Sequence, residues 1–434
     1  MTESLKVALL GGGTVGSQVA RLMASTGHHL AARAGAPLEL VGVAVRDTSR
    51  HRDGIDDELL TDDPAALVAR PDVDIVVEVM GGMDPTYDLL LDAMAHGSSV
   101  VSANKALIAT KGPELHAAAE ANGVDLYYEA AVAGAIPLLR PLRESLVGDR
   151  VRRVLGIVNG TTNYILTKMD EEGARYDDVL AEAQRLGYAE ADPTADVEGY
   201  DAAAKAAILA GLAFHSSVSM DQVSCEGISR LTPEDMTSAA ESGFVVKLLA
   251  VAELADDGRG IVVRVHPAMV PRSHPLASVR DAYNAVFVEA DAAGQVMFYG
   301  RGAGGEPTAS AVLGDLVAVA RNRLAGRPGP ARSDYAGLPV LPLGMARTRY
   351  AVSLVVHDRP GALAAVAQVF ADGGVSLQSV RQEGGLEDGR PDAVLQVRTH
   401  VAAESDLQQV VEQLRQLEQV KEITGVIRVE GGSE

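Results

Sequence analysis

The fold is decided by residues 5–16, which are Leu-Lys-Val-Ala-Leu-Leu-Gly-Gly-Gly-Thr-Val-Gly. The first half is an apolar run bounded by glycines, which predicts a buried strand of a parallel sheet. The second half fits the pattern G-x-G-x-x-G, and a helical pattern follows from Val15 to about Ser25. Glycines allow a tight turn there, and the start of the helix offers unpaired N–H groups to a pyrophosphate. Because the motif lies between a strand and a helix, we interpret it as a dinucleotide-binding turn rather than a merely structural one.

Strands and helices continue to alternate over the first third of the chain. Apolar runs predict strands at residues 38–45, 73–80, 99–102 and 124–129, and helical patterns lie near 87–96 and 113–122. This alternation is typical of a doubly wound, Rossmann-like parallel sheet. We therefore predict an α/β nucleotide-binding domain at residues 1–145.

Two further domains are predicted after it. Residues 146–330 have the pattern of an α+β catalytic and dimerisation domain, in which a helix at 307–323 is expected to pack back on the first domain. The stretch 327–342 contains Arg-Pro-Gly-Pro, Gly-Leu-Pro and Leu-Pro, which indicates a linker, and we assign it to residues 331–348. Residues 349–434 alternate in the order βαββαβ, which is typical of a ferredoxin-like domain.

Charge and composition narrow the classes of partner. The net charge of −21 argues against nucleic acid and anionic membranes as partners. No apolar stretch approaches the ~20 residues of a membrane-spanning helix, and the first ten residues lack the features of a signal peptide. Cys225 is the single cysteine, which excludes an internal disulfide. We therefore expect a cytoplasmic protein with a small-molecule substrate.

The end of the second predicted strand bears on cofactor choice, because this position normally meets the adenosine ribose. Arg46 could pair with a 2′-phosphate and favour NADP, whereas Asp47 could bind a ribose hydroxyl and favour NAD. A solvated Arg–Asp pair in a loop is the third interpretation. We favour NADP and leave NAD open.

Two lysines are candidate active-site residues. Lys105 follows the predicted strand at 99–102, and the carboxyl ends of such strands face the ligand crevice. Lys205 lies four residues after Asp201 in a segment of Ala, Ile and Leu, so we predict a buried helix on which the two can pair. A buried lysine is costly unless its charge is neutralised or used, which makes Lys205 a candidate proton carrier. The acidic segment before it contains Glu190 and Asp196.

Several motifs together resemble those of homoserine dehydrogenases over nearly the whole chain. They are the glycine-rich turn 11–16, SANKALIA at 102–109, EAAVAGAIP at 129–137, NGTTNYIL at 159–166, the segment 187–209 and GRGAGGEPTASAV at 300–312. The last unit resembles an ACT domain, a ligand-sensing module, whose Asp358–Leu363 turn leads from a strand into a helix. No aspartokinase-like segment precedes the first strand, so we expect a monofunctional enzyme.

The resemblance implies a role for each site residue. The reaction would be reversible, NAD(P)-dependent reduction of L-aspartate 4-semialdehyde to L-homoserine, in threonine, methionine and isoleucine biosynthesis. Lys205 would donate the proton and Lys105 would lie near the nicotinamide, while Glu190, Asp201 and Asp196 would hold the substrate. The implied cofactor contacts are Gly11, Gly12, Gly13, Thr14, Val15, Gly16, Arg46, Ser102, Lys105, Gly187 and Gly304.

The resemblance also implies a cation site and regulation. Glu129, Val132, Gly134 and Ile136 match a site described as sodium in relatives, built from carbonyl oxygens and one carboxylate; an ordinary strand-to-turn connection is the alternative. Threonine is the expected effector of residues 349–434, with a purely dimerising role as the alternative. A homodimer or homotetramer is expected.

The sequence departs from the family at two positions. Gly12 stands where relatives often have a bulkier residue, and Glu306 stands where Gly is frequent, beside the predicted cofactor loop. Two other functions compete with the dehydrogenase: another Rossmann oxidoreductase with an aspartate-like substrate, and a catalytically silent sensor that binds dinucleotide. Lys205, Glu190 and the NGTTN turn at 159–163 argue against the first, and Lys105, Lys205 and Glu190 argue against the second.

Overall fold

The computed structural model describes residues 3–384 and 392–432. Residues 1–2, 385–391 and 433–434 fall within the predicted domains 1–145 and 349–434 but lie outside the described part. The chain divides into two compact units. Unit 1 comprises Met1–Val154, Ala204–Asp221 and Tyr283–Leu338, and unit 2 comprises Leu155–Ala203, Gln222–Ala282 and Pro339–Glu434.

Unit 1 is built on a parallel sheet with the strand order β3-β2-β1-β4-β5-β6. Its strands are β1 (Leu5–Leu10), β2 (Leu38–Ala44), β3 (Leu60–Thr61), β4 (Ile75–Glu78), β5 (Ser99–Ser102) and β6 (Leu126–Tyr127). The helices between them are α1 (Thr14–Ala34), α2 (Pro64–Val68), α3 (Thr86–Ala95) and α4 (Lys105–Asn122). This is the doubly wound fold that the alternating pattern predicts.

Two elements of this sheet differ from the sequence-based expectation. Helix α4 begins at Lys105, eight residues before the expected start, because the Asn104 side chain caps it by accepting a hydrogen bond from Leu107 N. Pro113 is tolerated inside this helix. Strand β6 ends at Tyr127, because a short 3-10 turn starts at Glu129.

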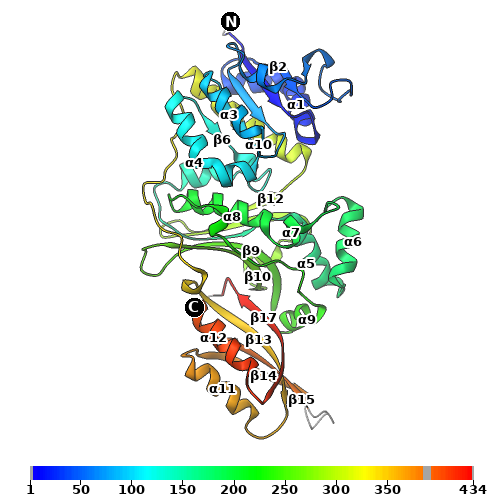
Figure 1. Cartoon of the computed structure of the whole chain (residues 1–434), viewed down its shortest axis with the longest axis vertical. Coiled ribbons are helices and arrows are strands. Elements are labelled where there is room, and N and C mark those ends of the chain that lie inside the picture. Colours follow the sequence, from blue (N-terminus) through cyan, green and yellow to red (C-terminus); the bar gives the residue numbers. More distant parts are fainter. Residues whose placement is uncertain (1–2, 385–391, 433–434) are drawn as a thin grey trace. The chain divides into compact units, whose positions relative to one another are not determined.

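Helix α10 (Gly305–Leu324) packs against α1 in the core of unit 1, as expected for residues 307–323 (Figure 1). Its apolar face contributes Val312, Leu316 and Val319, which are fully buried. Burying each such side chain contributes roughly 1.5–3 kcal/mol. The hairpin of β11 (Tyr283–Ala290) and β12 (Gly294–Arg301) precedes α10, and its second strand was not expected from the sequence.

Strand β7 (Val151–Ile157) and helix α8 (Tyr200–Ala213) are the elements along which the chain passes between the units. In unit 2, β9 (Phe244–Leu254) pairs with β10 (Ile261–Pro271), to which the short strand β8 (Ser224–Cys225) also pairs. Its helices before the C-terminal segment are α5 (Gly160–Glu172), α6 (Tyr176–Leu186), α7 (Thr194–Val197) and α9 (Pro233–Glu241).

The C-terminal segment has the predicted βαββαβ order. It consists of β13 (Arg347–His357), α11 (Ala362–Asp372), β14 (Leu377–Gly384), β15 (Asp392–Thr399), α12 (Glu404–Arg415) and β17 (Val420–Val429), with the short strand β16 (Ala402–Ala403) before α12. Helices α11 and α12 cover one face of its sheet (Figure 1), and Val366, Phe370 and Leu407 belong to the core between them.

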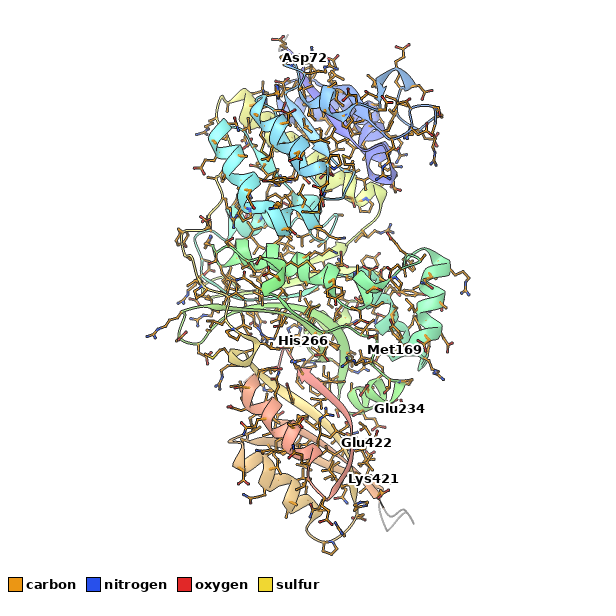
Figure 2. All side chains as sticks on the ribbon, viewed as in Figure 1. Asp72, Met169, Glu234, His266, Lys421 and Glu422 are labelled. Atoms are coloured by element: carbon orange, nitrogen blue, oxygen red, sulfur yellow. The ribbon has the colours of Figure 1, made fainter. Side chains whose placement is uncertain are left out.

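This sheet continues into the preceding one, because β17 pairs in parallel with β10. Buried charges lie along the junction: Arg264 of β10 pairs with Glu253 at 2.6 Å and with Glu430 at 2.9 Å. Figure 2 labels His266 on β10, which is also buried and lies 3.4 Å from Glu430. The C-terminal segment is therefore structurally continuous with the rest of unit 2.

Candidate active site

The glycine-rich turn has the backbone geometry that a dinucleotide-binding turn needs. Gly11 has a φ of +108°, and a Cβ added to Gly16 would lie 1.8 Å from the Gly11 carbonyl oxygen. A Cβ on Gly12 would lie 2.8 Å from side-chain atoms of Arg52 and Val45, so the bulkier residue of relatives would require those side chains to move. The turn thus brings backbone N–H groups to the start of α1.

A cavity of about 310 Å3 opens at the carboxyl ends of β4 and β5 in unit 1. This is the edge of a parallel sheet at which ligands bind. Of the residues expected at the site, the lining includes Val15, Gly134, Lys105 and Lys205; the remaining lining residues are Glu78, Val79, Met80, Gly81, Ala103, Asn104, Ala130, Ala131, Ala133, Gly302, Ala303 and Thr308.

The two lysines enter the cavity from different helices. Lys105 is the first residue of α4 and is half-buried. Lys205 lies on α8 and is only 8% exposed, which confirms the predicted burial. Two cationic side chains in one cavity favour an anionic occupant or a developing oxyanion.

Other expected cofactor residues lie outside this lining. Ser102 is fully buried, and its hydroxyl donates a hydrogen bond of 2.6 Å to Glu78. Gly304 caps α10 with a φ of +121°, next to the lining residue Ala303. Arg46 is exposed just after β2, and Gly187 is the C-cap of α6 in unit 2.

Glu306 does not reach the cavity lining. It lies in the first turn of α10, and its exposed carboxylate forms an ion pair with Arg21 of α1. An acidic side chain there is favoured by the helix dipole. Glu306, which departs from the family pattern, therefore links α10 to α1 and does not alter the cavity lining.

Three expected substrate-binding acids belong to unit 2. The side-chain amide of Asn159 donates hydrogen bonds to Asp196 (2.7 Å) and to Asp201 (2.9 Å), so the structure brings these two carboxylates together. Asp201 is buried, whereas Glu190 is exposed between α6 and α7. Asn159 was quoted in a motif but not singled out from the sequence; its place before Gly160, as an N-cap, is the signal that marks it.

In the segment expected to bind a cation, the Glu129 carboxylate already accepts hydrogen bonds from the protein itself. Glu129 is buried and accepts hydrogen bonds from the backbone N–H groups of Leu138, Leu139 and Arg140, the last two at 2.7 and 2.9 Å. Asp315 beside it accepts from Glu129 N, and burial together with the Glu129 charge raises the pKa of Asp315 to about 7. The Glu129 carboxylate is thus engaged by the protein's own N–H groups, so the candidate cation ligands at Glu129, Val132, Gly134 and Ile136 are their backbone carbonyl oxygens.

Neither a metal cluster nor a membrane segment is found in the described residues. Among residues 3–384 and 392–432, no three His, Cys, Asp or Glu side chains gather as metal ligands do. Across the same residues, every helix is too short or too polar to cross a lipid bilayer.

Three family models match the chain in sequence order. "Homoserine dehydrogenase, NAD binding domain" matches residues 11–129, "Homoserine dehydrogenase" matches 137–317 and "ACT domain" matches 350–419. The fold and the cavity with its two lysines therefore define a nicotinamide-dependent oxidoreductase that carries an ACT domain.

Relatives extend the match to nearly the full length. Homoserine dehydrogenase of Corynebacterium glutamicum is 56% identical over 99% of this chain and 96% of its own length, and that of Mycobacterium tuberculosis is 57% identical over 98% and 97%. The crystal structure of a homoserine dehydrogenase from Thiobacillus denitrificans superposes with a TM-score of 0.91, at 40% identity and 99% coverage of both chains. The chain belongs to the homoserine dehydrogenase family.

A hyperthermophilic archaeal homoserine dehydrogenase, solved in complex with NADPH, is more distant. It has a TM-score of 0.62 at 26% identity, and the match covers 76% of this chain and 100% of that one. The expected doubly wound domain, nicotinamide cofactor and ACT domain are confirmed by these comparisons. The domain boundaries and individual residue roles stay predictions.

Proposed function

We propose that this chain reduces L-aspartate 4-semialdehyde to L-homoserine reversibly, with NADPH as the preferred cofactor. The observation that carries the proposal is the presence of Lys105 and Lys205 in one cavity beside the glycine-rich turn. Bound NADPH would supply the hydride. The chain's own task is to hold the aldehyde and to provide a proton where negative charge develops.

Each side chain has a proposed part in this reaction. Lys205 donates the proton to the carbonyl oxygen, and its burial makes proton transfer a more plausible use of its charge than solvation. Lys105 would lie near the nicotinamide and the reacting carbon once both are bound. Glu190 and Asp201 neutralise the substrate ammonium, and Asp196 supports Asp201.

The preference for NADPH rests on the residues after β2. The Asp47 carboxylate already accepts hydrogen bonds from the N–H (3.0 Å) and hydroxyl (2.6 Å) of Ser49, which lower its pKa. Both bonds end on Oδ1, so they hold Asp47 in its turn without engaging Oδ2, and a ribose hydroxyl of NAD stays the alternative partner. Arg46 is exposed and cationic, as a reader of a 2′-phosphate should be.

We further propose that threonine regulates the enzyme through residues 349–434. The turn at Asp358–Gly361 precedes α11, whose first N–H groups suit the carboxylate of an amino acid. The enzyme would act in threonine, methionine and isoleucine synthesis in the cytoplasm. It would assemble as a homodimer or homotetramer. A sodium ion held by the backbone carbonyl oxygens of Glu129, Val132, Gly134 and Ile136 completes the proposal without a part in the chemistry.

The test is the oxidation of NADPH or NADH at 340 nm with L-aspartate 4-semialdehyde as substrate. We expect turnover, with a higher kcat/KM for NADPH. Succinic semialdehyde, which lacks the amino group, is the control and should react poorly. Cofactor binding without turnover would identify a silent sensor, and equal rates with the two aldehydes would overturn ammonium recognition.

A further inference from the structure

A buried acid, Glu78, closes one side of the cavity. It is the last residue of β4, and its cross-strand partner in the parallel sheet is Ser102, the last residue of β5. The residue has no exposed surface although it lines the cavity. Glu78 follows Ile75, Val76 and Val77 and is the one charged residue of strand β4.

The Glu78 carboxylate is bound on both of its oxygens. Oε1 accepts hydrogen bonds from the backbone N–H groups of Met80 and Gly81, each at 2.9 Å. Oε2 accepts a hydrogen bond from the Ser102 hydroxyl, with an oxygen–oxygen distance of 2.6 Å. One side chain therefore ties the loop after β4 to the end of β5.

Asn104 joins the same two segments from the other side. Its N–H donates to the Ser102 hydroxyl oxygen at 3.0 Å, and its side-chain amide donates to Gly82 O at 2.7 Å. Its side-chain oxygen caps α4. Glu78, Met80–Gly82, Ser102 and Asn104 thus form a closed circuit of hydrogen bonds, which we name the Glu78 ring.

Burying the Glu78 carboxylate in this ring costs more free energy than a purely structural role requires. A carboxylate removed from water is strongly disfavoured, and burial accordingly raises the pKa of Glu78 against the effect of its donors. A neutral side chain could cap two N–H groups without that penalty. Ring members Glu78, Met80, Gly81 and Asn104 line the cavity, and Lys105 follows Asn104 directly.

We infer that Glu78 is a positioning residue for the reaction: through the ring it fixes the Met80–Gly82 loop and the first turn of α4, and so holds Lys105 in place at the cofactor cavity. This inference rests on the proposed function, because it takes Lys105 as a residue of the reaction. Gly81 and Gly82 have φ values of +72° and +76°, so the loop that Glu78 holds has a backbone conformation that most residues resist.

Glu78→Gln and Ser102→Ala test the ring separately. In Glu78→Gln, the amide oxygen can still accept hydrogen bonds from the N–H groups of Met80 and Gly81, but the NH2 group cannot accept one from the Ser102 hydroxyl. Ser102→Ala removes that hydroxyl. We expect each variant to lower kcat, and Glu78→Gln to do so by about ten- to a hundredfold, since small displacements of reacting groups cost up to about 10²-fold. Both should weaken NADPH binding several-fold, measured by the fluorescence of NADPH itself because the chain has no Trp.

The double variant separates positioning from general destabilisation. If both residues act through one ring, the effects of Glu78→Gln and Ser102→Ala on kcat are not multiplicative. Ser98→Ala is the matched control, because Ser98 is equally buried and donates to Val73 O, but lies before β5 and outside the cavity lining. It should lower Tm about as much as Ser102→Ala does and leave kcat unchanged.

Two results would overturn the inference. One is a kcat and an NADPH dissociation constant within twofold of the wild-type values in both variants. The other is a loss of kcat in Ser98→Ala equal to that in Ser102→Ala, which would make the effect one of stability alone. A wild-type chain that binds NADPH without turnover would instead refute the proposed function, and the NADPH dissociation constants would still decide whether the ring shapes the cavity.

Discussion

Asn159 donates a hydrogen bond of 2.9 Å from its side-chain amide to the buried carboxylate of Asp201. The same NH2 group bonds Asp196 at 2.7 Å, while the amide oxygen accepts from Thr162 N and caps α5. One side chain therefore holds two acids together and also starts a helix. The two tasks use different atoms, so substitutions can separate them.

Asn159→Asp should raise KM for the semialdehyde at least tenfold and also lower Tm, because residue 159 is buried beside two other carboxylates. Asp remains a good N-cap, but it replaces the donor with a third negative charge beside Asp196 and Asp201. A hydrogen bond to a charged group contributes about 1.5–3 kcal/mol, which corresponds to roughly tenfold or more. Steady-state kinetics and thermal unfolding measure the two effects.

Asn159→Ser is the companion variant, because it keeps a capping oxygen and removes the donor without adding charge. It should raise KM less than Asp does. A wild-type KM in both variants would contradict the role assigned to the bridge.

Lys205→Ala should lower kcat by about 10²–10⁴-fold, the usual contribution of general acid catalysis. NADPH binding should survive, because the substitution removes a proton donor and leaves the glycine-rich turn intact. Lys168→Ala is a suitable control, since Lys168 forms an ion pair with Glu172 of the same helix, α5, and lies outside the cavity lining. Retention of most of the kcat in Lys205→Ala would refute its assignment.

Arg46→Ala should weaken NADPH binding by tenfold or more and leave NADH binding nearly unchanged, because only NADPH carries the 2′-phosphate. Fluorescence titration with both cofactors measures this. Arg50→Ala, which removes a neighbouring exposed cation, controls for general loss of positive charge. An equal loss of affinity for both cofactors would show that Arg46 does not recognise the 2′-phosphate.

Threonine regulation is best tested in the full-length chain. Removing residues after Pro342 would take away β17, the partner of β10, and Glu430, the partner of Arg264. Arg264 would keep Glu253 but lose one of its two carboxylate partners, and β10 would lose a neighbouring strand, so the truncated chain would be destabilised for reasons unrelated to regulation.

Asp358→Ala should leave turnover unchanged and weaken threonine inhibition at least tenfold, because Asp358 lies in the turn before α11 and accepts a hydrogen bond from Gln382 of β14. Initial rates against threonine concentration give the inhibition constants. Asp372→Ala, at the other end of α11, is the control. Unchanged inhibition in Asp358→Ala, competitive with the semialdehyde, would locate threonine in the active site.

Lys247 predicts a pH dependence of stability. Burial lowers its pKa to about 8, below the ordinary value of 10.5, and its ammonium donates to Asn163 and to Val279 O. Between these pKa values the unfolded chain binds the extra proton, so this group makes the free energy of unfolding rise with pH, by at most about 1.4 kcal/mol per unit. Urea unfolding of wild type and Lys247→Met from pH 7 to 10 should show a difference that grows with pH in favour of wild type. A constant difference would contradict the shifted pKa.

The sequence by itself determined the elements whose pattern is local. The alternation of β1, β2, β4, β5 and β6 with helices, the glycine-rich turn and the βαββαβ order follow from periodicity and from residues such as Gly11 and Gly16, whose requirements are met by near neighbours. The burial of Lys205 was predicted for the same reason, because the apolar residues that surround it are its own helix neighbours. Strand β3 and helix α2 were not predicted.

Only the tertiary structure decided which distant polar groups meet. Glu78 and Ser102 are 24 residues apart, and Asn159 and Asp201 are 42 apart. The Glu129 carboxylate, a candidate cation ligand from the sequence, accepts hydrogen bonds from three backbone N–H groups that only the fold brings to it. The physical reason is that a buried polar atom must find a partner, but the chain topology, rather than the residue type, selects which partner is within reach.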